Sequence, residues 1–259
     1  MVKNFILVLT ILSFSLTVSG KKKEEPPDPA WAGITARGRM LAEYHSAARH
    51  ATDALLAAHP EHGSATIYVA KKTDAGWVVA FGRFNDPHDR FLVVYQATQG
   101  VTPDAFKIAQ NLPPQEDADF FYRAAKAVEI CGSDFHGDKH RFDIAVLPAE
   151  SNQMYVYIYP AQSVKGVFVY GGDVRYRVSA DGSTIVEKRQ MHKTILQYRE
   201  DLGPGKTVVG GVHSHVLSDV PEDTDVFYVL IRIPRVPEAI GAGKHVYQVQ
   251  VDGTIKRMQ

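Results

Sequence analysis

Short strand-like segments separated by turn residues fill most of the chain after residue 64 and constrain its fold more than any other feature. Residues 65–84 form two such segments joined at 73–76, and residues 174–190 form two more around Asp181-Gly182. Turn residues of this kind between runs of strand-forming residues are typical of β-hairpins. Further strand-like segments occupy residues 90–97, 141–149, 154–161, 207–215, 226–233 and 244–258. Strands joined by tight turns pair antiparallel, so the sequence predicts a largely antiparallel, meander-like sheet.

Two segments repeat apolar residues at helical spacing instead. The first runs from Trp31 to about His59 and ends at Pro60 and Gly63, and the second runs from Asp117 to about Ile130. Their apolar stripes contain Met40, Leu41, Tyr44, Ala48, Leu55 and Leu56 in the first segment, and Phe120, Phe121, Ala124, Ala127, Val128 and Cys131 in the second. We therefore expect an α+β fold, with two helices packed on the antiparallel sheet, formed by residues 31–259 as a single domain.

The first 20 residues have the pattern of a secretory signal peptide. Lys3 precedes an apolar or hydroxylic run over residues 5–18, and small residues follow at 19 and 20. That run is shorter than the roughly 20 residues of a membrane-spanning helix. Residues 21–30 are charged and rich in proline, which predicts a tether. We expect a signal peptide at 1–20, a secreted or periplasmic location, and no membrane span in the mature chain.

The charge balance and the cysteine content exclude several classes of protein. The chain has 29 basic and 29 acidic residues, so no excess of positive charge favours nucleic acid or an anionic membrane. Its single cysteine, Cys131, permits no internal disulfide. The fold must therefore be stabilised by its apolar core, and the sequence identifies no partner.

The stretch from Gly210 to Phe227 contains the main chemical signal in the sequence. His213 and His215 are two residues apart, so on a strand they project from the same face, as two imidazoles must to bind one zinc ion. Asp225 could supply a third ligand and leave a fourth position for water, which is the arrangement of a catalytic zinc site. The alternative is that both histidines are structural or face solvent, and that the protein has no cofactor.

This stretch resembles the metal-binding motif of the JAMM (MPN-type) metallo-isopeptidases, although Glu222 stands at the position of the motif's serine. The resemblance implies that His213, His215 and Asp225 bind zinc. It also implies that Glu129, in the segment Glu129-Ile130-Cys131-Gly132, is the general base. A helical projection instead places Glu129 far from the apolar stripe and towards solvent, unless the helix ends before it.

A second candidate site consists of three tyrosines. Tyr155, Tyr157 and Tyr159 alternate along one predicted strand and share a face. Tyrosine combines a flat apolar ring with a polar tip, so an uncovered face of this kind would suit a peptide or sugar ligand. The alternative is that a helix covers the face.

Two classes of function remain. The chain as a whole resembles exported bacterial proteins, which implies a location in the bacterial envelope and favours a non-catalytic binding or structural protein. The second class is a JAMM-like, zinc-dependent hydrolase of peptide or isopeptide bonds. A hydrolase requires His213, His215 and Asp225 to converge beside a carboxylate. A binding protein requires the tyrosine face to be open.

Overall fold

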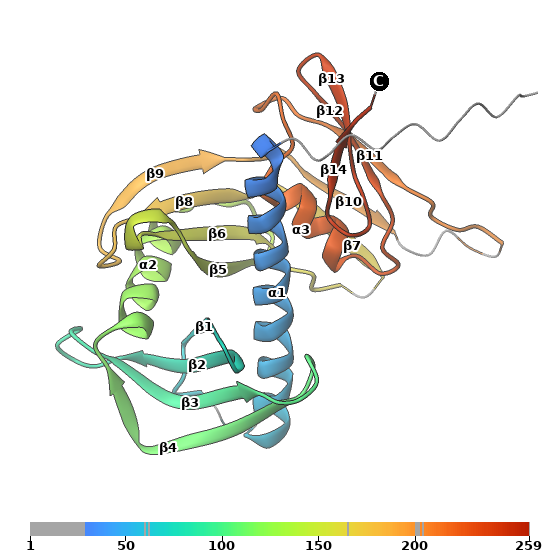
Figure 1. The fold of residues 1–259 in the computed structure, drawn as a ribbon. Helices are drawn as coiled ribbons and strands as arrows, with labels where there is room; N and C mark the ends of the chain where they lie inside the picture. Colours follow the sequence, from blue (N-terminus) through green and yellow to red (C-terminus); the bar gives the residue numbers. More distant parts are fainter. Residues whose placement is uncertain are drawn as a thin grey trace, which may run out of the picture.

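The strands form four separate sheets, and three helices pack against them (Figure 1). The computed structural model describes residues 29–259 except 60, 62, 165, 200–202, 204 and 259. The helices are α1 (Pro29–Ala58), α2 (Phe120–Asp134) and α3 (Asp223–Ile231), with a short 3-10 helix at Glu150–Asn152. The predicted α+β class is confirmed, but the number of helices and the single sheet are not. The predicted signal segment and residues 21–28 of the predicted tether lie outside the described residues, and 29 and 30 already belong to α1.

The first sheet is a meander of four strands, and a second four-stranded sheet follows α2. The first has the order β1-β2-β3-β4 and the second the order β5-β6-β8-β9, and all of their pairs are antiparallel. Their bounds are β1 (Ile67–Thr73), β2 (Gly76–Phe84), β3 (Phe91–Gln99), β4 (Phe106–Asp117), β5 (Phe142–Pro148), β6 (Met154–Pro160), β8 (Val174–Val178) and β9 (Ile185–Gln190). The predicted hairpin turns at 73–76 and at Asp181-Gly182 are confirmed.

The remaining strands form a two-stranded sheet and a C-terminal sheet. β7 (Val167–Gly171) pairs with β10 (Ile195–Arg199). The C-terminal sheet has the order β11-β12-β13-β14, with bounds Gly211–Ser214, Glu238–Ala242, His245–Val249 and Ile255–Arg257. β11 lies parallel to β12, which is the one parallel pair among the described strands. This crossover carries the chain through α3, which places the helix beside the histidines of β11.

The long helix α1 joins these sheets. It runs past the first sheet at one end of the molecule and reaches the C-terminal sheet at the other (Figure 1), where Trp31 contacts the ring of Tyr247 edge-on. Leu41, Tyr44 and Leu55 on its inner face are at most 2% exposed and belong to the largest apolar core. No helix among the described residues is long and apolar enough to cross a membrane.

The face of β6 that carries the three tyrosines is covered. Tyr157 and Tyr159 are 0% and 2% exposed and pack in the core with residues of α1 and α3, so that the Tyr159 ring lies 4.7 Å from the Phe227 ring. Tyr155 lies at the rim, where its hydroxyl donates to Glu150. Of the two alternatives for this face, the structure has the covered one, because α1 and α3 supply apolar cover for the tyrosine rings.

The third helix replaces a predicted strand at residues 226–233. Val226 to Val229 are all buried, so the apolar run has no exposed side and no periodicity that distinguishes a helix from a strand. The helix is specified at its start instead. The carboxylate of Asp225 accepts the backbone N–H of Glu222 in a capping box, and Asp223 and Asp225 place negative charge in the first turn.

Two glycines of α1 are expected to respond in opposite ways to replacement by alanine. A methyl group at Gly38 would lie 2.5 Å from the carbonyl oxygen of Asp223 and 2.5 Å from Cβ of Val226, so α1 and α3 would have to move apart. We expect Gly38→Ala to destabilise the protein by about 1–3 kcal/mol, despite alanine's higher helix propensity. Gly33 is exposed and would meet only the end of Arg37. Gly33→Ala should therefore stabilise by up to about 1 kcal/mol.

Urea unfolding of both variants checks this pair. Equal stabilisation by the two substitutions would contradict the close approach of α1 to α3 at Gly38.

Candidate metal centre

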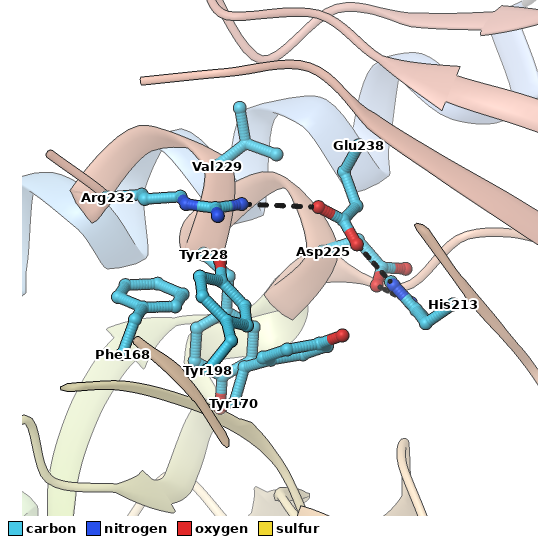
Figure 2. Close-up of a pocket in the computed structure, with 9 residues that line it drawn as sticks. All are labelled: Phe168, Tyr170, Tyr198, His213, Asp225, Tyr228, Val229, Arg232 and Glu238. Atoms are coloured by element: carbon cyan, nitrogen blue, oxygen red, sulfur yellow. Dashed lines mark hydrogen bonds and ion pairs between the residues drawn. The ribbon is translucent and has the colours of Figure 1, made fainter. Parts of the chain in front are cut away.

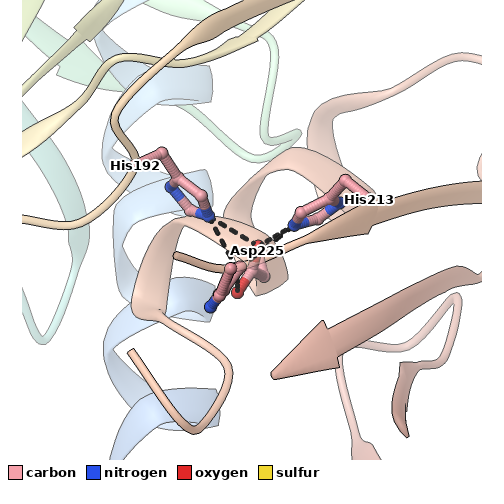
Figure 3. Close-up of side chains that lie close together, drawn as sticks. His192, His213 and Asp225 are labelled. Atoms are coloured by element: carbon pink, nitrogen blue, oxygen red, sulfur yellow. Dashed lines mark hydrogen bonds and ion pairs between the residues drawn. The ribbon is translucent and has the colours of Figure 1, made fainter. Parts of the chain in front are cut away.

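Four side chains from separate parts of the chain converge beside α3. His192 follows β9, His213 lies on β11, His215 comes directly after β11, and Asp225 lies in the first turn of α3. Each offers one ligand atom, and these atoms all lie within 4.8 Å of one another. Figure 3 shows His192 and His213 approaching Asp225 from two sides. All four side chains are at most 8% exposed.

Four of the six separations between the ligand atoms are close to those of a tetrahedral metal site. Nε2 of His215 lies 3.0 Å from Nε2 of His192 and 3.2 Å from Nε2 of His213. Oδ1 of Asp225 lies 3.1 Å from Nε2 of His192 and 3.0 Å from Nε2 of His213. Ligand atoms bound to zinc at roughly 2.0–2.1 Å in a tetrahedron are about 3.3 Å apart. These four separations suit a site with three nitrogen ligands and one oxygen ligand, and all the ligand atoms lie within 4.8 Å of one another.

The outer nitrogen of each histidine is bonded to a fixed acceptor. Nδ1 of His192 lies 2.7 Å from Oδ1 of Asp173, and Nδ1 of His213 lies 2.9 Å from Oε1 of Glu238. Nδ1 of His215 lies 3.0 Å from the backbone carbonyl of Val220. Carboxylates and carbonyls only accept, so each Nδ1 must donate its hydrogen. In the neutral rings the three Nε2 lone pairs therefore all face the centre, as in histidines that bind metals.

The charged groups around the cluster carry a net negative charge that a divalent cation would balance. Asp173, Asp225 and Glu238 bring three carboxylates into buried positions. Arg232 brings one guanidinium, 3.6 Å from Oε2 of Glu238. Three negative charges and one positive charge leave two negative charges to be compensated.

The pKa shifts of the cluster have the same origin. Burial alone would lower the pKa of His213, but hydrogen bonds to Asp225 and Glu238 outweigh it and raise this pKa to about 9. Burial is likewise outweighed at His192, where Asp173 and Asp225 raise the pKa well above its ordinary value. For Asp225 burial would raise the pKa, and the three histidines hold it well below its ordinary value. Protons on the histidines and a metal ion are therefore alternative ways to compensate the same carboxylates.

Local structure fixes the direction of each ligand. Oδ2 of Asp225 accepts the backbone N–H of Glu222 at 2.6 Å, which turns Oδ1 towards His192 and His213. The backbone N–H of His215 donates to the carbonyl of Gly241 of β12, so the parallel pairing of β11 and its extension holds His213 and His215 beside α3.

Beside the cluster lies a small cavity with aromatic walls. Figure 2 shows its lining, in which Arg232 faces Glu238 and Glu238 faces His213, and the rings of Phe168, Tyr170 and Tyr198 form one side. Its volume is about 10 Å³, which is space for roughly one water molecule. A peptide group could not reach His213 or Asp225 through this cavity without rearrangement.

The predicted zinc ligands His213, His215 and Asp225 are brought together, whereas the predicted base is not. Glu129 lies on the outer side of α2, which continues to Asp134, and its Oε2 lies 3.0 Å from Nε2 of His88. Its side chain is 46% exposed, as the helical projection indicated. The geometry therefore gives Glu129 no part in the cluster. Glu222, at the position of the motif's serine, pairs with Arg189.

The sequence reasoning missed His192, Asp173 and Glu238. His192 lies 21 residues before His213 and outside any local pattern, so only the packing of β9 against α3 brings it to the site. The nearest signal in the sequence for these residues is Glu238, on the strand after α3. A histidine that binds a metal usually donates its other ring N–H to a carboxylate or a carbonyl, so a carboxylate near the pair was to be expected.

Comparisons with known proteins assign the chain to no family. No protein-family model matches the chain, and no curated protein and no solved structure matches it either. The function must therefore be inferred from the four converging side chains and their surroundings.

Proposed function

We propose that the protein binds one zinc ion at His192, His213, His215 and Asp225, as a non-catalytic part of its fold. The observation that supports this most directly is the orientation of the three imidazoles. Each donates from Nδ1 to an outer acceptor, so three Nε2 atoms face one buried carboxylate oxygen. Lone pairs 3.0–3.2 Å apart repel one another unless a proton or a metal ion lies between them.

The ligand set favours zinc among the divalent metals. Imidazole nitrogen suits zinc and other late transition metals, whereas calcium and magnesium prefer oxygen ligands. A tetrahedral arrangement of three nitrogens and one oxygen is a common zinc geometry.

Two features favour a structural over a catalytic ion. A catalytic zinc has three protein ligands and one position for water, and here His192 occupies the position that His213, His215 and Asp225 would leave to water. The adjoining cavity has space for about one water molecule and none for a peptide substrate. The zinc would connect the segment after β9 to β11 and to α3. Apart from contacts among the ligands themselves, the polar contacts between that segment and α3 in the described part of the chain are those of Thr224 with Met191 and His192. The signal-like segment at 1–20 supports an exported location for such a protein.

The zinc content of the purified protein tests the proposal. We expect one zinc per chain by elemental analysis and, by X-ray absorption, four nitrogen or oxygen ligands at about 2.0–2.1 Å with no sulfur. The double variant His213→Ala, His215→Ala and the single variant His192→Ala should each lose more than about 100-fold in zinc affinity. Even a change to a residue that only hydrogen-bonds a metal ligand costs about 10- to 100-fold.

Two outcomes would count against it. A wild-type protein that neither contains zinc nor takes it up would remove the metal site. A His192→Ala variant that keeps zinc at full occupancy would show a site of two histidines, Asp225 and water, and would favour the hydrolase. His88→Ala is the matched control, because His88 is 50% exposed and contacts Glu129 rather than the cluster.

A further inference from the structure

A second, larger pocket is a groove that shares Arg232 with the cavity beside the metal centre. It has a volume of about 650 Å³ and lies between one face of α1 and the segment that follows α3. In Figure 1 these two elements lie next to each other along the middle of α1. Pockets that hold small organic ligands have volumes of roughly 300–1,000 Å³. The groove is thus large enough for a small molecule, unlike the cavity beside His213.

The walls of the groove carry an excess of positive charge. Arg39, Arg49 and Arg235 are exposed and line it. Arg39 donates to the backbone carbonyl of Asp252, and Arg235 donates to that of Leu230. Among the described residues, no carboxylate forms an ion pair with any of the three guanidinium groups.

Within the described part of the chain, the two acidic residues of the groove form no ion pair with these arginines, although hydrogen bonds from Thr254 and, to a smaller extent, the charge of Arg39 lower the pKa of Asp252. Glu43 pairs with Lys72 of β1. The carboxylate of Asp252 accepts the backbone N–H and the hydroxyl of Thr254, at 2.9 and 2.7 Å. Because a concave surface concentrates the field of its charges, three unpaired guanidinium groups make the groove attractive to anions.

The rest of the lining suits the body of an organic ligand. Ile233 is 72% exposed and lies at the wall beside Pro234 and Ile231. His45 also lines the groove, and its Nδ1 lies 3.3 Å from the hydroxyl of Tyr159. No described residue forms a hydrogen bond with its Nε2, so this nitrogen remains available to a ligand.

We propose that this groove binds a small organic anion, with a phosphate or carboxylate group held by Arg39, Arg49 and Arg235 and an apolar part against Ile233 and Pro234. Arginine is the side chain best suited to this task, since its planar guanidinium donates two parallel hydrogen bonds to an oxyanion. The inference does not depend on zinc, because none of the four proposed ligands lines the groove.

Calorimetric titration of the full, zinc-saturated protein tests the proposal with three probes of similar size: phenyl phosphate, benzoate and the neutral benzyl alcohol. We expect an anionic probe to bind and benzyl alcohol not to. Arg49→Gln and Arg235→Gln should each weaken that binding at least about tenfold, which corresponds to the loss of one hydrogen bond to a charged group. Arg90→Gln, at an exposed arginine outside the groove that pairs with Asp89, should leave it unchanged.

The comparison of phenyl phosphate with benzoate identifies which oxyanion the groove prefers. The proposal would be overturned if neither anion bound up to millimolar concentration, if benzyl alcohol bound as tightly, or if Arg90→Gln weakened binding as much as Arg49→Gln. Zinc content, measured on the same samples, should be unchanged in all three variants, so a failure here is distinguishable from a failure of the zinc proposal.

Discussion

The difference in stability between zinc-loaded and metal-free protein is expected to widen by about 3 kcal/mol or more between about pH 6 and pH 9. In the metal-free protein, a proton on His213 helps to compensate Asp225 and Glu238, and the pKa of this residue is about 9. Its ordinary pKa is about 6.5. A raised pKa stabilises the folded state fully below the unfolded value, and that stabilisation is lost as the pH rises towards 9. His192 is shifted in the same direction.

At the proposed site zinc would replace these protons, so we expect the zinc-loaded protein not to lose this stabilisation as the pH rises. Urea unfolding of zinc-loaded and chelator-treated protein at three pH values between 6 and 9 measures the difference directly. The variant His213→Ala, His215→Ala serves as the control, and zinc should not stabilise it at any of these pH values. A difference that stays constant from pH 6 to pH 9 would show that protons and metal do not compete for this cluster.

Local sequence patterns predicted the parts of the fold that depend on local interactions. The first helix, the hairpin at 73–76 and the hairpin at Asp181-Gly182 were correct to within a few residues, because spacing and turn residues specify them. The strand predicted at residues 226–233 was wrong, because these residues belong to or follow the helix α3. The apolar residues of this helix are buried on every side, and the signal for a helix is confined to the capping contact between Glu222 and Asp225.

The same limit applies to the metal centre. His213 and His215 could be paired from the sequence because alternation along a strand places them on one face. His192 could not be found, because its approach to Asp225 depends on how the second sheet packs against α3. The sequence could not decide between an open and a covered tyrosine face for the same reason, since a strand pattern defines a face but does not specify what covers it. Sequence patterns thus identified three of the four proposed ligands, and tertiary packing brings in the fourth, His192.

The buried carboxylate of Asp223 is expected to be the largest single polar contribution to stability outside the metal centre. It is 1% exposed and lies at the start of α3, where Arg175 of β8 contacts Oδ2 at 2.5 Å and Arg37 of α1 contacts Oδ1 at 2.9 Å. The hydroxyl of Tyr157 donates to Oδ2 at 2.9 Å. Asp223 thereby connects α1, β6 and β8 to the helix that carries Asp225.

Replacing Asp223 by alanine should lower the free energy of unfolding by about 3–5 kcal/mol, because two largely buried guanidinium groups and a buried hydroxyl would lose their acceptor. The matched control is an ion pair of Arg177, which lies two residues after Arg175 on β8. Arg177 pairs with Glu187 at 3.1 Å, but these side chains are 34% and 46% exposed. Glu187→Ala should therefore cost at most about 1 kcal/mol, since solvent screens an exposed pair. If urea unfolding gave similar losses for the two variants, burial would not be what makes the Asp223 network strong, and α3 would have to be held in place by its apolar contacts alone.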